Sequence, residues 1–231
     1  MVTACMIVIF TEVFSLSKSI AQMPYDSEKD KKIIVIDPGH GGHDKGTVGN
    51  SGLMEKDITL TISKLISNEM KDRFTVILTR TDDYSIDLSE RTAFANHHKA
   101  NLFVSIHTNG SYILKKNGIT ISYFEKQTKN ENLEKLTIGK QNINSPTPWE
   151  DIQDNQTSKS REFAQAMTKY LPGNISILKA PVYVLSGAGM PSILIEIGYL
   201  TNPSDENKLN NIKYLNTISQ NICSGIENFL K

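Results

Sequence analysis

The sequence predicts an α/β fold, namely a single-domain open, mainly parallel twisted sheet with helices on both faces. Short apolar runs rich in β-branched residues alternate along the chain with segments of helical periodicity, which is typical of buried parallel strands joined by helices. The chain has 231 residues, 39% of them hydrophobic, and nothing in it repeats at a fixed period. We therefore expect one sizeable core and one domain.

Six segments are predicted to be strands, because they are short and rich in β-branched or aromatic residues. In chain order they are 33–37, 74–79, 102–107, 119–124, 182–185 and 192–197. In an open α/β sheet, binding sites form outside the carboxyl ends of the strands. Polar residues at those ends are therefore the first candidates for function.

Helices are predicted between the strands and after the last one. The first has apolar residues on one face, and the second covers about 89–98. Ser158 is placed to cap a third, and Asn202 with Pro203 supplies the start of a fourth. A long apolar stripe from Ile212 to Phe229 then indicates a final helix or helix pair. The apolar residues of the first helix are Ile58, Ile62, Leu65, Ile66 and Met70.

A polar stretch from about 125 to 157 breaks this alternation and contains Trp149, the only tryptophan. It is too long for an ordinary connection in a compact domain, and such loops are usually functional or disordered. We expect an insertion that is either a lid over a cleft or a plain surface loop.

The first 21 residues have features of a signal peptide, because an apolar stretch is followed by the small-x-small pattern Ser19-Ile20-Ala21. Glu12 interrupts the apolar run, so a disordered leader is the alternative. The stretch lacks the roughly 20 apolar residues of a membrane-spanning helix. We expect a signal peptide over 1–21, a polar linker over 22–31, the globular domain over 32–231, and export without stable membrane insertion.

Charge and cysteine content exclude several classes of function. Lys+Arg and Asp+Glu both number 25 and no basic stripe is present, so nucleic acid is not an expected partner. Cleavage after Ala21 would remove Cys5 and leave Cys223 alone. Neither an internal disulfide nor a cysteine-based metal site is then expected.

Four residues stand where a buried segment gives way to a loop or helix. His40 lies in Asp-Pro-Gly-His-Gly-Gly, Glu55 in Glu-Lys-Asp, His107 in Ser-Ile-His-Thr-Asn and Glu196 in Glu-Ile-Gly-Tyr-Leu-Thr-Asn. Zinc hydrolases commonly hold the metal with two histidines and a carboxylate and keep a fourth position for water. His40, Glu55 and His107 match that ligand set. Glu196, flanked by isoleucines, is the candidate general base and acid.

Each of these residues also has a structural explanation. His40 could cap a helix or adjoin an anion site, Glu55 could be a solvated carboxylate at a helix start, and His107 could be a core histidine. The occurrence of all four motifs in this order favours a metal centre.

At these motifs the sequence resembles the zinc-dependent N-acetylmuramoyl-L-alanine amidases of the amidase_3 family, which are bacterial cell-wall hydrolases. The resemblance runs from about Lys32 to about Leu230. It implies one Zn²⁺ held by His40, Glu55 and His107, with Glu196 catalytic, and cleavage between N-acetylmuramic acid and L-alanine in peptidoglycan. It also implies a monomer in the periplasm or cell wall, and an activator protein is a possible partner.

Other polar residues match the family pattern and are expected to brace the loops around the metal. They are Thr79, Arg80, Ser89, Glu90, Arg91, Asn96 and Asn109. His43 is expected at the rim of the site, and His97 and His98 at a solvated helix end. Two other functions fit the same residues: a zinc peptidase acting within the stem peptide, and a non-catalytic peptidoglycan-binding protein on the same fold.

Overall fold

The computed structural model describes residues 31–113, 115–125 and 148–231, and for 148–155 the backbone alone. Lys32–Lys231 form one compact unit. The predicted signal peptide, the linker up to residue 30 and residues 126–147 of the predicted insertion lie outside the described residues.

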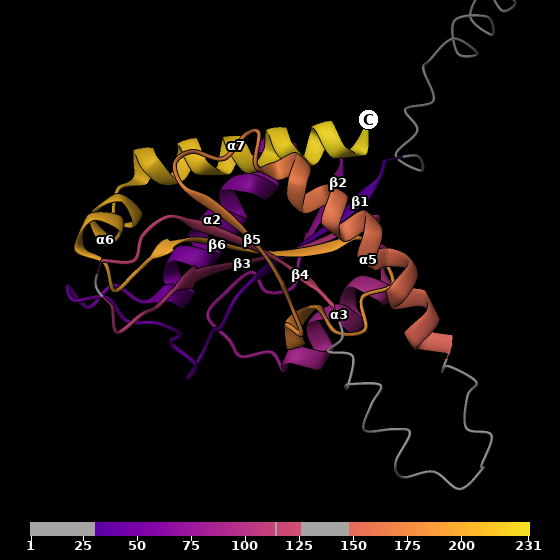
Figure 1. Ribbon diagram of the computed structural model, residues 1–231, viewed down its shortest axis with the longest axis horizontal. Coiled ribbons are helices and arrows are strands. Elements are labelled where there is room, and N and C mark those ends of the chain that lie inside the picture. The colour runs from indigo at the N-terminus through magenta and orange to yellow at the C-terminus, as the bar shows by residue number, and fades with distance from the viewer. Residues whose placement is uncertain (1–30, 114, 126–147) are drawn as a thin grey trace, which may run out of the picture. The chain divides into compact units, whose positions relative to one another are not determined.

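The described residues form a six-stranded sheet in the order β2-β1-β3-β6-β4-β5 (Figure 1). Neighbouring strands are parallel except for β4 and β6, which are antiparallel. The predicted mainly parallel sheet is therefore confirmed. The strands are β1 (Ile33–Pro38), β2 (Thr75–Leu78), β3 (Leu102–Asn109), β4 (Ile119–Phe124), β5 (Ile175–Ala180) and β6 (Ser192–Tyr199).

Helices cover both faces of the sheet, as predicted. On one face, α2 (Glu55–Met70), α5 (Pro148–Met167) and α7 (Ile212–Leu230) enclose the larger part of the core, and α6 (Pro203–Leu209) leads into α7 (Figure 1). On the other face, α3 (Leu88–His97) and the short 3-10 helix η2 (Tyr183–Leu185) enclose a smaller apolar cluster. None of the described helices is long and apolar enough to cross a membrane.

The alternation of side chains along the central strands decides which face carries the polar residues. Ile106 of β3 and Ile195 of β6 belong to the larger cluster, whereas Phe103 and Leu194 belong to the smaller one. Because the strand period is two, His107 and Glu196 point to the side of Phe103 and Leu194. Both therefore lie on the face of α3, where fewer elements cover the sheet.

The predicted strand at 182–185 is wrong, because Val182 precedes η2 and the other three residues form it. Val184 and Leu185 are apolar because they pack into the smaller cluster under α3. The strand that the sequence did not predict is β5, at the edge of the sheet. Ser176 and Lys179 interrupt its apolar residues and its four central residues are exposed, so it lacks the continuous apolar run that marks a buried strand.

The predicted cap at Ser158 is also wrong, since α5 begins at Pro148 and Ser158 lies inside it. Proline is favoured in the first turn of a helix, where its missing N–H costs nothing. Residues 148–157 of the predicted insertion are thus helical. At α6 the prediction is confirmed, because Asn202 Oδ1 accepts hydrogen bonds from the backbone N–H groups of Ser204 and Asp205.

Candidate metal centre

His40 lies in the turn after β1, with its backbone in the left-handed region at φ 60°. Non-glycine residues rarely adopt this conformation, so neighbouring groups must hold the turn. Arg80 donates through Nε to the carbonyl of Pro38 at 3.0 Å and through Nη2 to that of Gly39 at 2.8 Å. Arg91 donates through Nη1 to Pro38 at 2.9 Å and through Nη2 to His40 at 3.1 Å. Both arginines brace the turn, as expected from the sequence.

The charge of Arg91 is balanced by Asp37, which is fully buried in β1. Arg91 Nη1 lies 2.7 Å from Asp37 Oδ1, and Ser105 Oγ donates to Asp37 Oδ2 at 2.7 Å. The hydroxyl of Thr79 also donates to this carboxylate. A buried carboxylate needs such partners, because an unpaired charge is costly away from water. The network ties β1, β3, α3 and the residue that follows β2 together beneath His40.

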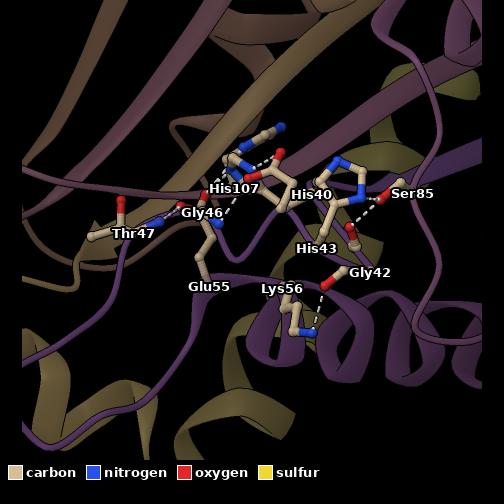
Figure 2. Close-up of polar contacts among 12 residues, drawn as sticks. His40, Gly42, His43, Gly46, Thr47, Glu55, Lys56, Ser85 and His107 are labelled. Carbon is tan, nitrogen blue, oxygen red and sulfur yellow. Dashed lines mark hydrogen bonds and ion pairs between the residues drawn. The ribbon is translucent and has the colours of Figure 1, made fainter.

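Glu55 is the first residue of α2, and its side chain is only 2% exposed. Its Oε2 accepts from the N–H of Thr47 at 2.7 Å, and its Oε1 accepts from the N–H of Thr108 at 2.8 Å. Oε1 also lies 3.1 Å from His40 Nε2 and 3.1 Å from His107 Nδ1 (Figure 2). Burial disfavours the charged form, but the two histidines hold the pKa of Glu55 well below its usual value.

His107 approaches from β3, and its ring lies directly against the backbone of Gly39. A Cβ atom on Gly39 would be 2.4 Å from His107 Cε1, so only glycine leaves room for the imidazole there. The rings of His40 and His107 meet edge to face, with centroids 4.9 Å apart. The second nitrogen of His107, Nε2, is buried without a hydrogen-bond partner among the described residues.

His40, Glu55 and His107 each offer one ligand atom, and these atoms lie within 4.8 Å of one another. Two imidazole nitrogens and one carboxylate oxygen form a donor set that suits Zn²⁺. The arrangement therefore fits a metal ion. The structure brings together the three residues that the sequence singled out as ligands.

Glu196 lies on β6 in direct register with His107 on β3. Its Oε2 accepts a hydrogen bond from Nδ2 of Asn109 at 2.9 Å. Burial, together with the nearby charge of Glu55, raises the pKa of Glu196 to about 7, although the bond from Asn109 acts in the opposite sense. A carboxyl group with such a pKa can accept and return a proton near neutral pH.

A cleft of about 330 Å³ opens beside His40 and His107, and Ser85, Ile86 and Leu88 are among its lining residues. His43 is exposed at this cleft, with its Nδ1 2.9 Å from Ser85 Oγ, as expected for a rim residue.

His97 and His98 lie at the end of α3, outside the cluster of three ligand candidates. His97 is exposed and His98 is half-buried, with its Nδ1 2.9 Å from the carbonyl oxygen of Phe94. On the same helix, Asn96 braces the segment before β6. It donates to the carbonyl of Gly187 and accepts from the N–H of Gly189, both at 2.8 Å.

Sequence reasoning missed three contacts to the ligand candidates. Asp44 Oδ2 lies 2.8 Å from His40 Nδ1, and Glu55 is held by the backbone N–H groups of Thr47 and Thr108. The i,i+4 spacing of Asp44 after His40 signals a contact only on a helix, and these residues form a turn instead. A backbone donor gives no signal in the sequence, because every residue except proline supplies one.

Comparison with known proteins agrees with this geometry. Residues 34–228 match the family model Amidase_3, described as N-acetylmuramoyl-L-alanine amidase. The protein YqiI of Bacillus subtilis (strain 168) is 34% identical over 199 residues, which cover 86% of this chain and 84% of that protein.

Two solved structures are also similar. The catalytic domain of CwlV, an N-acetylmuramoyl-L-alanine amidase from Bacillus (Paenibacillus) polymyxa var. colistinus, is 31% identical with a TM-score of 0.69, and the match covers 86% of this chain and 98% of that one. The CwlD amidase from Clostridioides difficile, solved in complex with the GerS lipoprotein, is 26% identical with a TM-score of 0.63, over 86% and 98% of the two chains.

Proposed function

Because the chain belongs to the Amidase_3 family of N-acetylmuramoyl-L-alanine amidases, we propose that its peptidoglycan hydrolysis depends on zinc held by His40, Glu55 and His107, with Glu196 as the catalytic base. The amide that is cleaved joins the lactyl group of N-acetylmuramic acid to L-alanine. One observation carries the proposal: three potential ligands meet at the carboxyl end of the sheet, and Glu196 stands in register beside one of them.

The three proposed ligands each present one atom toward a common point. His40 presents Nε2 and His107 presents Nδ1, on either side of the Glu55 carboxylate. Zinc, when bound, supplies Lewis acidity toward the amide carbonyl and lowers the pKa of water to about 7. The carboxylate of Glu55 is already held by the N–H groups of Thr47 and Thr108, so it needs little reorganisation to bind the ion.

Glu196 moves the protons of the reaction. Its carboxylate takes a proton from the attacking water and then delivers it to the nitrogen of L-alanine as the amide bond breaks. The pKa of about 7 supports both steps at neutral pH. Asn109 donates a hydrogen bond to Oε2 of Glu196, and we assign the proton transfer to the other oxygen, Oε1.

We also propose that the protein is exported and acts in the periplasm or at the cell wall as a monomer. Its substrate is a polymer of the cell envelope, and the apolar stretch near the N-terminus with Ser19-Ile20-Ala21 is consistent with export. A similar amidase has been solved in complex with a lipoprotein. An activating protein partner is therefore part of the proposal.

Digestion of purified peptidoglycan, with products identified by mass spectrometry, tests the function. The proposal requires stem peptides with a free L-alanine amino terminus and glycan strands whose lactyl groups end in carboxylates. Cleavage between residues of the stem would instead indicate a peptidase. Absence of products from the zinc-loaded protein, with cell-envelope extract added to supply an activator, would indicate a binding protein.

A further inference from the structure

Asp44 stands directly behind one of the candidate ligands. Its Oδ2 lies 2.8 Å from His40 Nδ1, and the opposite ring nitrogen, Nε2, is the atom that faces Glu55 Oε1. We propose that Asp44 is a positioning residue that fixes the orientation and the tautomer of His40 for metal binding. This inference rests on the proposed zinc site.

The turn keeps Asp44 in place. The backbones of Gly41 and Asp44 exchange two hydrogen bonds, of 3.0 and 3.2 Å, which close a tight turn directly after His40. The second carboxylate oxygen, Oδ1, accepts from the N–H of Gly46 at 3.0 Å. Although the side chain is 56% exposed, both of its oxygens are therefore committed by local geometry.

The hydrogen bond sets the chemistry of the ring. A neutral imidazole carries its proton on one nitrogen and an acceptor lone pair on the other. Because a carboxylate can only accept, Asp44 requires the proton on Nδ1 and leaves the lone pair of Nε2 for the metal. Asp44 thus selects the tautomer that a ligand at this position needs.

His107 is held in a different way. Its second nitrogen has no hydrogen-bond partner among the described residues, and its ring is positioned by contact with Gly39. The two imidazoles therefore differ at the nitrogen that faces away from Glu55: in His40 it meets the Asp44 carboxylate, and in His107 it meets none of the described polar groups. Loss of Asp44 should accordingly affect His40 without displacing His107.

Asp44→Asn is the sharpest variant. Asparagine has nearly the same shape but one acceptor oxygen, so it cannot accept from both Gly46 and His40 Nδ1. Asp87→Asn is the matched control. Asp87 is exposed, lines the same cleft and makes no side-chain cap bond at α3, so this change removes the same charge without touching His40.

Two measurements test the proposal on the full chain. Competition with a chromophoric chelator should show a zinc dissociation constant about 10–100-fold higher for Asp44→Asn and unchanged for Asp87→Asn. Nitrogen-15 NMR of the zinc-loaded native protein, in which Glu55 binds the ion and does not compete for a proton on Nε2, should show a slowly exchanging proton on His40 Nδ1. In Asp44→Asn this proton should exchange faster with water.

A native zinc dissociation constant in folded Asp44→Asn would overturn the proposal, as would a His40 Nδ1 proton in the zinc-loaded native protein that exchanges as fast as one exposed to water. The NMR result on the native protein decides the question even if the variant does not fold. Failure of the native protein to bind zinc would instead contradict the proposed function and this inference together, whereas equal zinc binding by the native protein and Asp44→Asn would contradict this inference alone.

Discussion

His107 and Glu196 are direct partners in the register between two parallel strands, β3 and β6. Both side chains leave the same face of the sheet at its carboxyl edge, so the distance between them is set by the strand pairing rather than by a loop. A candidate ligand and a candidate base on adjacent central strands are held more precisely than they would be on mobile segments. This relationship makes separate tests of metal binding and proton transfer possible.

His107→Ala should abolish zinc binding and activity together. The change removes one of three candidate ligands and leaves Glu55 without one of the two histidines that favour its ionised form. Elemental analysis of the purified protein measures the zinc content. His43→Ala is the control, since His43 lies at the rim and contacts Ser85, and it should retain one zinc per chain. Stoichiometric zinc in His107→Ala would refute the ligand assignment.

Arg91→Met should destabilise the fold strongly. It leaves the fully buried Asp37 without its cationic partner, and breaking a buried ion pair from one side typically costs about 3–5 kcal/mol. Urea denaturation measures the free energy of unfolding of each variant. Arg73→Ala removes a surface pair with Glu227 and should cost only about 0–1 kcal/mol. Equal free energies of unfolding for the two variants would show that the buried pair of Arg91 and Asp37 adds no more stability than a surface ion pair.

Cys223 should be inert in the native protein. It is 2% exposed in α7, and burial raises its pKa to about 12, so the reactive thiolate is scarce at pH 8. In a Cys5→Ser variant, Ellman's reagent should detect no thiol until denaturant is added, and then one. Rapid reaction in native buffer would mean that α7 opens readily from α2.

The sequence predicts the central part of the fold because buried parallel strands leave continuous apolar runs. That signal located β1, β3 and β6, whose carboxyl ends hold His40, His107 and Glu196. It failed at β5, an exposed edge strand in which Ser176 and Lys179 interrupt the apolar run. It also failed at 182–185, where apolar residues are buried under α3 without pairing in the sheet.

The same limit applies to the site. Residue types with metal or acid–base chemistry are visible in a sequence, and they led to the three residues that meet at the sheet edge. The contacts that hold them are less visible. Thr47 and Thr108 act through their N–H groups, which residue type does not mark, whereas the bracing of the His40 turn by Arg80 and Arg91 was expected from the resemblance to the family.

Glu196→Gln separates catalysis from metal binding. The substitution keeps the size of the side chain and an oxygen that can accept from Asn109, but it removes the ability to take a proton. Glu196 is not counted among the ligands, so the variant should keep the zinc content and melting temperature of the native protein. Its turnover of peptidoglycan should fall by about 10²–10⁴-fold, the usual contribution of a general base.

The variant's zinc content distinguishes the alternatives for Glu196. Zinc retained with activity lost supports a base that acts beside the metal. Zinc lost together with activity would make Glu196 a fourth ligand, which its register with His107 permits. Zinc and activity both retained would mean that another group moves the proton. In that case the raised pKa of Glu196 would reflect burial between the strands and the charge of Glu55, with no part in the reaction.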